Sequence, residues 1–549
     1  MSDPKRVVII GGVAGGMSAA TRLRRLDPTA SITVLERSGN VSFANCGLPY
    51  FVGGLIEEEE DLILQTPQQL FERFRLDVHV NSEVVGIDPS AHQVEVRSTI
   101  DGEVTTIAYD ALILSMGAAP VRPPIPGYER AATLRTVEDA ALLAAAAGRG
   151  ANAVVIGAGF IGLEVTENLI EQGLSVTLVE AAPQVLPPLD PEMAITLVDE
   201  LERHGVRVEV GVGVIEITED EVVLADGRRL RADLVVGAIG VRPDVRLAEA
   251  AGLAIGPKGG IAIDEVNLTS DPSIYAVGDA TEKVDAVSQA SSLIALANIA
   301  NRQGRRVADH IAGLVTRTPP SLGTAIVKVF DVVAASVGWS EKRLAETDRS
   351  YQAIHSHPFD HATYYPGATR MSAKLIYDTD DLGILGAQIV GQNGVDKRID
   401  VIATAMAAGI KADELADLEL AYAPPFSSAK DPVNMLGYMA ENISSGSCEV
   451  VTANEVDGLV ADGWKLVDVR TPGEVALGTI DGAVNIPVDE LREHLAEFGE
   501  DPIMVFCAVG QRGHTAAALL SELGKKVRNL DGGYVTWTAW QRASSLSSH

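Results

Sequence analysis

The chain contains the same local arrangement twice: a short apolar run, a glycine-rich turn, a helical stretch and a second apolar run that ends in a glutamate. In the first copy the apolar run covers 6–10, the turn 11–16 and the expected helix 17–26, and a second run at 32–35 is closed by Glu36. Runs of β-branched residues without alternation are typical of parallel strands buried on both faces. The repeat therefore requires an α/β fold with at least two parallel sheets.

The first turn has the composition of a phosphate-binding loop. Glycines there let the backbone approach a pyrophosphate, the following helix offers unpaired N–H groups, and an acid after the second strand accepts a hydrogen bond from a ribose hydroxyl. Val13 stands where the middle glycine of the usual fingerprint would be, so this copy alone is also compatible with a plain tight turn. The candidate nucleotide-binding residues are Gly11, Gly12, Ala14, Gly15, Gly16, Glu36 and Arg37.

The second copy, which begins at residue 153, matches the full fingerprint. Its candidate residues are Gly157, Gly159, Phe160, Ile161, Gly162 and, after a helix over 163–172 and a strand over 175–179, Glu180. Two such units predict two dinucleotides, one of which can be held tightly while the other exchanges. Glu180 would accept from a free ribose 2′-OH and repel a 2′-phosphate, and no arginine follows at 181–183. NADH is therefore favoured over NADPH at the second site.

Later strand ends complete a recognisable order. The runs 109–118 and 233–240 carry glycine near their ends, at Gly117 and Gly240, and the run 274–280 carries Gly278 and Asp279, an acid placed to meet a polyol hydroxyl. This succession resembles the flavoprotein pyridine nucleotide-disulfide reductases. The resemblance implies FAD at the first turn and at Gly278–Asp279, NAD(P)H at the second turn with Gly240, and a strand-rich module near the end that forms a homodimer.

Composition restricts the partners. The net charge of −31 argues against general binding to nucleic acid or to an anionic membrane. Three cysteines are too few for a secreted disulfide framework, and the first apolar run is too short for a signal-peptide core or a membrane span. We expect a cytoplasmic protein that acts on small molecules. No metal site is predicted.

The expected fold class is α/β, with two Rossmann-like dinucleotide-binding domains, an α+β dimerisation domain and a C-terminal α/β domain. The small polar stretch 442–447 has linker composition, and alternating strands and helices begin afresh beyond it. We expect the following limits: FAD-binding 1–117 and 246–322, NAD(P)H-binding 118–245, dimerisation 323–441, linker 442–453 and C-terminal domain 454–549.

Cys46 lies among small and turn-forming residues just after the first nucleotide unit. A lone cysteine can simply be a small buried hydrophobe. The position at which dithiol reductases carry their second redox cysteine is Phe51 here, which excludes an internal disulfide at this site. If Cys46 is redox-active, it must form a mixed disulfide with a small thiol or an oxidised sulfur such as a sulfenate.

The stretch 42–50 closely resembles the coenzyme A-disulfide reductases, in which a single cysteine cycles through a disulfide with coenzyme A. The resemblance implies that Tyr364 and Tyr422 act in catalysis, with Tyr365 as the alternative to Tyr364. It also implies a set of residues that face coenzyme A, of which Asn45 also borders the flavin: Arg22, Arg25, Ser42, Asn45, Asn301 and Lys430.

The C-terminal domain resembles a rhodanese sulfurtransferase. Asp468-Val469-Arg470 ends one expected strand, and Cys507 ends another and begins a loop that runs through Arg512 into a helix. Backbone N–H groups of such a loop, with Arg512, would stabilise a persulfide anion on Cys507. Thr479 stands where many rhodaneses have histidine, which puts substrate affinity in doubt, and Cys448 has no comparable setting.

Together these features predict an NADH-dependent flavoprotein of sulfur metabolism that reduces coenzyme A persulfide or polysulfide, and coenzyme A disulfide, through Cys46. Cys507 would handle sulfane sulfur. The alternatives are a coenzyme A-disulfide reductase with an accessory rhodanese domain, an NADH oxidase or peroxidase that uses a Cys46 sulfenate, and a redox sensor. The first glycine turn lacks the histidine that the peroxidases carry there.

Overall fold

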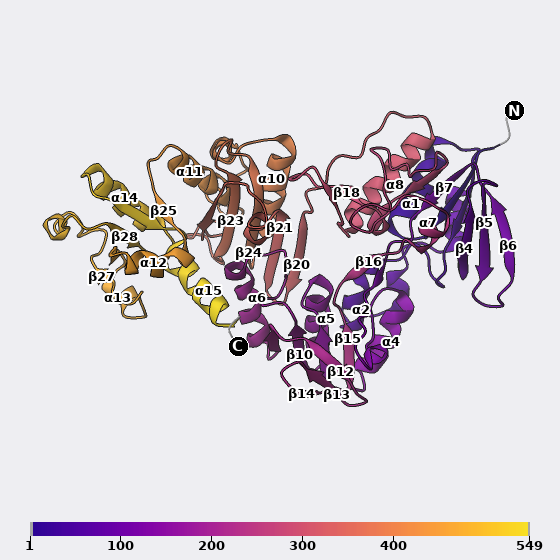
Figure 1. Ribbon diagram of the computed structural model, residues 1–549, viewed down its shortest axis with the longest axis horizontal. Helices are drawn as coiled ribbons and strands as arrows, with labels where there is room; N and C mark the ends of the chain where they lie inside the picture. The colour runs from indigo at the N-terminus through magenta and orange to yellow at the C-terminus, as the bar shows by residue number, and fades with distance from the viewer. Residues whose placement is uncertain (1–3, 547–549) are drawn as a thin grey trace. The chain divides into compact units, whose positions relative to one another are not determined.

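The computed structural model describes residues 4–546 (Figure 1). The chain forms two compact units. The first contains the residues up to Val179 together with Gly213–Gly323, and the second contains Glu180–Val212 and the residues from Thr324 onward. Among the described residues, no helix has both the length and the apolar character needed to cross a bilayer.

The first nucleotide unit forms the parallel sheet that its apolar runs predict. The strand order is β17-β7-β1-β2-β3, with parallel pairing throughout. Their bounds are β1 (Arg6–Ile10), β2 (Ser31–Leu35), β3 (Asp77–His79), β7 (Ala111–Leu114) and β17 (Ile274–Ala276). Ile10 is in register with Leu35 on one side and Leu114 on the other. The turns that follow these strands therefore meet at one edge of the sheet.

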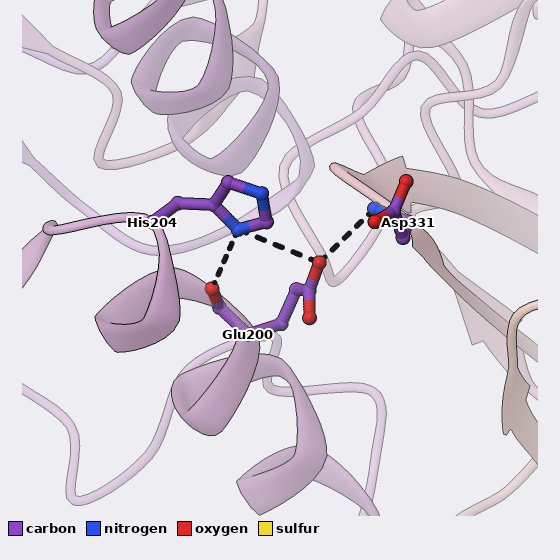
Figure 2. A group of neighbouring side chains, drawn as sticks. All are labelled: Glu200, His204 and Asp331. Carbon is purple, nitrogen blue, oxygen red and sulfur yellow. Dashed lines mark hydrogen bonds and ion pairs between the residues drawn. The ribbon is translucent and has the colours of Figure 1, made fainter.

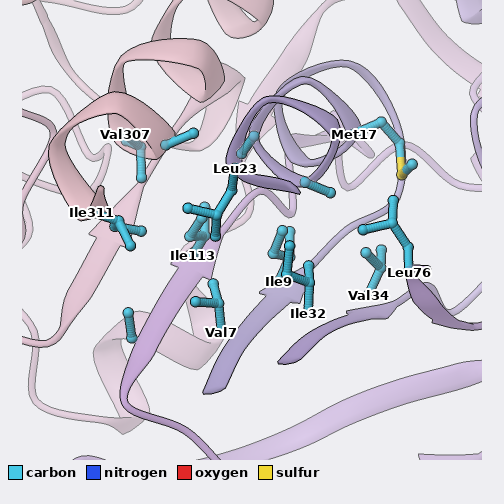
Figure 3. Close-up of a cluster of buried hydrophobic side chains, with 14 of the residues drawn as sticks. Val7, Ile9, Met17, Leu23, Ile32, Val34, Leu76, Ile113, Val307 and Ile311 are labelled. Carbon is cyan, nitrogen blue, oxygen red and sulfur yellow. The ribbon is translucent and has the colours of Figure 1, made fainter. Parts of the chain in front are cut away.

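Both faces of this sheet are buried. Helices α1 (Ala14–Leu26) and α8 (Ala297–Ile311) cover one face, where Val7, Ile9 and Ile113 pack with Leu23 and Val307 (Figure 3). The alternate residues of the same strands, including Val8 and Leu112, join a second cluster on the opposite face. Each fully buried side chain of this kind stabilises the fold by about 1.5–3 kcal/mol. Double-sided burial explains why the runs show no polar alternation.

The remaining parts of the first unit surround the two nucleotide motifs. The second motif is a parallel sheet in which β9 (Asn152–Ile156) lies between β10 (Ser175–Glu180) and β15 (Leu234–Gly237), with α5 (Phe160–Glu171) following β9. The other elements are α2 (Leu48–Val52), α3 (Pro67–Phe74), β4 (Ser82–Asp88), β5 (Gln93–Ser98), β6 (Val104–Ala108), β8 (Ala118–Pro120), α4 (Val137–Ala147), β12 (Val214–Ile217), β13 (Glu221–Leu224), β14 (Arg229–Arg231), β16 (Val241–Pro243), α7 (Arg246–Ala250), β18 (Lys283–Val284) and β19 (Ser291–Ser292).

The second unit contains an antiparallel sheet in the strand order β20-β21-β24-β23-β22. The predicted strand-rich module is therefore present. The elements of the second unit that precede the C-terminal domain, of which β11 lies outside this antiparallel sheet, are α6 (Pro191–Arg203), β11 (Arg207–Val210), β20 (Ala325–Val329), β21 (Val332–Gly338), α9 (Glu341–Leu344), β22 (Tyr351–Ser356), β23 (Met371–Asp378), β24 (Ile384–Gly391), α10 (Val395–Ala408) and α11 (Pro432–Ser444).

The C-terminal domain is a five-stranded parallel sheet in the order β25-β29-β28-β26-β27, which confirms the expected α/β architecture. Its elements are β25 (Val450–Val451), α12 (Val456–Ala461), β26 (Lys465–Asp468), α13 (Pro472–Val475), β27 (Val484–Asn485), β28 (Ile503–Phe506), α14 (Gln511–Glu522), β29 (Val527–Leu530) and α15 (Gly533–Leu546).

The structure differs from the sequence-based prediction in the segment 442–453, which was expected to be a linker. Helix α11 continues through Ser444, and β25 pairs in parallel with β29, so that Val450 is in register with Asn529. Small polar residues are poor helix formers in isolation, but burial of the apolar face of α11, including Leu436 and Ala440, extends the helix.

Candidate active site

The first glycine turn brings backbone segments too close for side chains. Gly11 has φ of +101°, and a Cβ there would lie 2.2 Å from the carbonyl oxygen of Ser115. A Cβ on Gly16 would lie 2.0 Å from the carbonyl oxygen of Gly11. No side chain among the described residues caps the N-terminus of α1, which begins at Ala14. The turn therefore leaves helix N–H groups available for a phosphate.

Glu36 closes this turn from the end of β2. Its Oε2 accepts the Gly12 N–H at 2.8 Å, and its Oε1 accepts the N–H and the hydroxyl of Ser38, each at 2.9 Å. A carboxylate offers about four lone-pair positions, so one remains for a ribose hydroxyl. Arg37 instead points its guanidinium to Asp244, with 3.7 Å between Nη1 and Oδ2.

Asp279 lies in a short 3-10 turn after β17, at the same edge of the sheet. Its Oδ2 lies 3.4 Å from Nη2 of Arg135, and the Gly278 N–H donates to Oε1 of Gln303 at 2.8 Å. The Nε2 of Gln303 is buried and has no hydrogen-bond partner among the described residues. An unsatisfied buried donor beside the Gly278 turn, together with the side-chain-free first turn, fits a bound FAD.

Lys283 supports the Gly278 turn from within the protein. Its Nζ donates to the carbonyl oxygens of Gly278 at 2.6 Å and Thr281 at 2.9 Å. Burial lowers the pKa of Lys283 to about 8, against the opposing effect of Asp279. Lys283, Gln303 and Arg135 were not predicted from the sequence, because no local motif distinguishes them from surface residues.

The second glycine turn has the geometry of a nucleotide-binding turn. Gly157 has φ of +103°, and a Cβ on Gly162 would lie 1.9 Å from the carbonyl oxygen of Gly157. Gly159 and Gly240 face open space instead, because nothing lies within 4 Å of a Cβ placed on either. Phe160 and Ile161 form the uncapped first turn of α5. This combination fits a pyrophosphate at the helix N-terminus.

Cys46 is an exposed thiol at the start of a short helical segment. It lies in a 3-10 turn, Asn45–Gly47, that continues into α2, and its Sγ lies 3.8 Å from Oδ1 of Asn45. The protein packed around its inner side raises the pKa of Cys46, the Glu164 carboxyl adds to this, and Arg135 opposes it. The preceding Ser42 adopts φ of +52°, a conformation uncommon for a non-glycine residue.

Glu164, on α5, is a candidate functional residue at this site that was not predicted from the sequence. Burial raises the pKa of its carboxyl to about 7, with a further contribution from Glu167. A half-buried carboxyl that interacts with a cysteine thiol is a candidate proton acceptor at neutral pH. Its position directly after the second fingerprint, at the third residue beyond Ile161, is the signal that could have identified it.

The residues predicted to face coenzyme A have mixed environments. Arg22 donates through Nε to Asp309 on α8 at 2.6 Å, and the guanidinium of Arg25 lies 5.3 Å from the ring centre of Phe74. Asn301 is exposed on α8, and its carbonyl accepts from the Ser18 hydroxyl at 2.8 Å. In the second unit, Lys430 stands over the ring of Tyr438 at 5.6 Å.

The predicted tyrosines separate into a bonded pair and a third residue. The hydroxyl oxygens of Tyr364 and Tyr422 lie 2.7 Å apart, although the residues are 58 positions apart in sequence. Tyr365 packs its edge against the ring of His361 instead. Tyr422 and the exposed Phe426 line a cavity of about 680 Å³. The structure thus brings together Tyr364 and Tyr422 and leaves Tyr365 apart from them.

Cys507 is fully buried at the end of β28. Arg512, five residues later, binds Glu474 through two charge-assisted hydrogen bonds of 2.8 and 2.6 Å. Glu474 raises the pKa of Arg512, as Cys507 also does, and Arg512 lowers the pKa of Glu474 to about 2. The sequence analysis did not identify Glu474, whose carboxylate orients the guanidinium of Arg512.

The buried pair Asp468 and Arg470 supports the same domain, with Arg470 Nη2 2.6 Å from Asp468 Oδ2. The hydroxyl of Thr479, the departure from the rhodanese pattern, donates to Asp468 at 2.7 Å. Cys448 is buried, and burial with nearby Asp531 and Glu449 raises its pKa to about 11. This environment makes Cys448 an unreactive thiol.

Glu200, His204 and Asp331 form a cluster that resembles a metal site (Figure 2). The guanidinium of Arg203 already contacts Glu200 at 2.6 Å and Asp331 at 3.3 Å. The ring of His204 stacks on Phe330, with 3.8 Å between ring centres. Because a guanidinium neutralises the carboxylates, this cluster is an ion-pair network.

Comparisons with known proteins agree with this geometry. Residues 5–304 match the family described as pyridine nucleotide-disulphide oxidoreductase, 324–432 match the dimerisation domain of that family, and 452–539 match the rhodanese-like domain. A coenzyme A disulfide reductase of Staphylococcus haemolyticus is 34% identical over 444 residues, which cover 80% of this chain and all of that protein.

Two solved structures resemble nearly the whole chain. Reduced Bacillus anthracis CoADR-RHD is 46% identical with a TM-score of 0.95, covering 98% of each chain. An NAD-dependent persulfide reductase from A. fulgidus is 38% identical with a TM-score of 0.91, covering 97% of this chain and 100% of the other. The chain is therefore an oxidoreductase of the pyridine nucleotide-disulphide oxidoreductase family, within the group of the coenzyme A disulfide reductases, and it carries a C-terminal rhodanese-like domain.

Proposed function

We propose that this protein uses NADH to reduce coenzyme A persulfide or polysulfide, and coenzyme A disulfide, through the single thiol of Cys46. The observation that carries the proposal is an exposed lone cysteine beside the first nucleotide site, with Phe51 where a second redox cysteine would stand. Such a thiol needs an external sulfur partner. The names of the relatives, coenzyme A disulfide reductase and persulfide reductase, support coenzyme A and persulfides as that partner.

The chemistry at Cys46 balances with these substrates. The thiolate attacks the inner sulfur of coenzyme A persulfide, forms the Cys46–coenzyme A disulfide and releases hydrosulfide. Two electrons then cleave that disulfide and return the Cys46 thiolate and coenzyme A. FAD, when bound at the first turn, supplies the route by which NADH provides those electrons.

The chain's own residues prepare this thiol. Asn45 contacts the sulfur, and Glu164, whose pKa is raised to about 7 by burial, accepts or returns a proton near neutral pH. Among the cations of the coenzyme A set, Lys430 is not ion-paired to a carboxylate in the described residues, whereas Arg22 is held by Asp309. We propose Lys430 and Arg25 as the stronger candidates for the coenzyme A phosphates.

We infer that Cys507 carries sulfane sulfur as a persulfide and passes it to coenzyme A or to Cys46. The buried cysteine, its following loop and the Arg512–Glu474 pair support this role. An accessory rhodanese domain is the competing possibility. It predicts that coenzyme A disulfide is turned over efficiently and coenzyme A persulfide is not.

We also propose a cytoplasmic homodimer. The match of 324–432 to a dimerisation domain supports the dimer, as do the exposed aromatic side chains Tyr364, Tyr422 and Phe426 on that domain. Three free cysteines are compatible with a reducing compartment. Sedimentation of the wild type and of a Phe426→Glu variant tests the dimer, because a charge at the buried centre of an interface would shift the mass toward the monomer.

The decisive experiment compares wild type with Cys46→Ser and Cys507→Ser, using coenzyme A persulfide and coenzyme A disulfide as substrates of NADH oxidation. Cys46→Ser should lose turnover of both substrates. Cys507→Ser should lose only the activity that starts from an external sulfane donor. Full persulfide reduction by Cys46→Ser would refute the proposed function, and coenzyme A adduct mass on the native protein would identify the species at Cys46.

A further inference from the structure

The segment 531–536 packs directly against the loop that carries Cys507. The Tyr534 N–H donates to the carbonyl oxygen of Cys507 at 2.8 Å, and the Val535 N–H donates to that of Ala508 at 3.0 Å. Gly533 approaches so closely that a Cβ would lie 2.4 Å from the Cys507 carbonyl oxygen. The position of this segment therefore sets the orientation of the first two peptide planes of the cysteine loop.

Strand β22 of the dimerisation domain holds the same segment from its other side. The backbone N–H of His355 donates to Oδ1 of Asp531 at 2.9 Å, and its Nδ1 lies 2.5 Å from Oδ2. Two residues later, Nε2 of His357 lies 2.7 Å from the hydroxyl of Thr536. A Cβ on the intervening Gly532 would lie 2.8 Å from the Cβ of His355. Both ends of the segment are thus anchored outside the rhodanese-like domain.

These anchors are buried and charged. His355 and Asp531 are 6% and 2% exposed, so the bonds between them are shielded from water. The Nε2 of His355 lies 3.1 Å from a carboxylate oxygen of Glu192. Glu192, Asp190 and Glu341 all form ion pairs with the buried ammonium of Lys374. Burial and the nearby Lys374 ammonium would each lower the pKa of His355. The carboxylates of Asp531 and Glu192 outweigh both effects and raise the pKa of His355 to about 9.

His357 has the opposite charge state. Burial, with His355 and Arg370 nearby, lowers the pKa of His357 to about 3, so its ring is neutral when His355 is charged. A charged histidine therefore holds the Asp531 carboxylate, and a neutral one holds the Thr536 hydroxyl. This division of charge matches the chemistry of the two partners.

We propose that His355 and His357 are positioning residues for the sulfur site at Cys507, supplied by the dimerisation domain to the rhodanese-like domain. The inference rests on the proposed function of Cys507. The two histidines fix segment 531–536, the segment orients the Cys507 and Ala508 carbonyls, and the loop then directs its N–H groups toward the sulfur. The rhodanese-like domain would consequently reach full reactivity only when it is docked on this strand.

The test measures alkylation of Cys507 by iodoacetamide, followed by peptide mass spectrometry, in the full-length FAD-loaded protein across about pH 6–9. His355→Leu should slow Cys507 alkylation at pH 7 by about ten-fold, because the loop that carries the thiol loses its anchored geometry. His355→Asn can still donate to Asp531 through its amide and should restore much of the rate. His204→Leu removes a histidine of the same unit that stacks on Phe330, outside the segment, and serves as the matched control.

Thr536→Val gives a milder second variant that removes only the hydroxyl bonded to His357, and it should slow alkylation by about three-fold, the effect of one hydrogen bond. NADH-dependent reduction of coenzyme A disulfide should stay within about two-fold in every variant, because Cys46 lies outside the segment. An unchanged rate of Cys507 alkylation in both His355→Leu and Thr536→Val would overturn the inference. If wild-type Cys507 transfers no sulfur, the proposed function fails separately, since alkylation reads the loop directly.

Discussion

Replacing Lys374 by methionine should destabilise the second unit strongly. The Lys374 ammonium is completely buried and lies 2.9 Å from Asp190 and 2.5 Å from Glu192, with Glu341 as a third acidic partner. At an effective dielectric constant of about 20, each contact near 3 Å contributes about 5 kcal/mol of attraction before desolvation. Because methionine is of similar length but uncharged, the substitution removes the cation that these three carboxylates share, and of the three only Glu192 keeps the contact with His355.

Desolvation of the charges offsets most of that attraction, so the net effect is smaller than the sum of the contacts. Breaking a buried ion pair by removing one partner typically costs about 3–5 kcal/mol. With a urea dependence of about 2 kcal/mol per molar, the unfolding midpoint should fall by about 2 M. Lys411→Met is the matched control, because Lys411 pairs with Asp381 at the surface, where the loss should be below about 1 kcal/mol.

Tryptophan fluorescence isolates the relevant unit. Trp339, Trp464, Trp537 and Trp540 are the only tryptophans of the chain, and all four lie in the second unit. A urea titration followed by their emission therefore reports unfolding of that unit even when the two units unfold separately.

The pH dependence supplies a second signature. Burial would raise the pKa of Glu192, but Lys374 and His355 hold it well below the ordinary range. Without Lys374 the buried Glu192 carboxyl takes up a proton more readily, so the loss of stability should shrink as pH falls from about 8 to 5. Adding Glu192→Gln should restore part of the loss at pH 8. A midpoint change no larger than that of Lys411→Met, at all pH values, would refute the reasoning.

Three further predictions concern the nucleotide and thiol sites. Glu164→Gln should raise the alkylation rate of Cys46 about three-fold at pH 8 and leave that rate unchanged at pH 6. The reason is that the Glu164 charge, which raises the pKa of Cys46, is present only above about pH 7. An equal effect at pH 6 and pH 8 would contradict the electrostatic influence of Glu164 on Cys46. Gly16→Ala should prevent stable folding of the first unit, since the added Cβ would meet the Gly11 carbonyl. Gly159→Ala should keep the melting temperature of the wild type and weaken NADH binding in fluorescence titrations. Similar losses of melting temperature in both variants would be inconsistent with open space at Gly159. Glu180→Ser should narrow the ratio of kcat/KM for NADH over NADPH by about ten-fold, and an unchanged ratio would remove Glu180 from nucleotide selection.

Local patterns determined the elements on which the nucleotide sites are built. A continuous β-branched run predicted β1 with the bounds that the structure has, and the glycine spacing predicted both tight turns. These features depend on short-range chemistry, because only glycine tolerates φ near +100° at Gly11 and Gly157 and because strands buried on both faces need no polar alternation. The absence of a second cysteine at position 51, where Phe51 follows Cys46 by five residues, is likewise evident from the sequence alone.

Tertiary structure decided where a helix begins when the residues at its first turn have low helix propensity. Helix α1 begins at Ala14 and includes Gly15 and Gly16, three residues earlier than the sequence predicted. Glycine is a poor helix former, but α1 and α8 approach so closely that a Cβ on Gly304 would lie 2.1 Å from the Gly15 carbonyl oxygen. The packing energy of this contact outweighs the propensity cost of about 1 kcal/mol per glycine.

Tertiary structure alone also assembled the side chains around each sulfur. Glu164 influences Cys46 from 118 positions away, Tyr364 and Tyr422 meet across 58, and His355 binds Asp531 across 176. No periodicity or spacing encodes such pairs, because each forms only when separate sheets and helices bury their apolar faces against one another. The sequence by itself determined that Cys46 and Cys507 follow strand ends and begin turns, and the packing of distant elements decided which acids, histidines and tyrosines surround them.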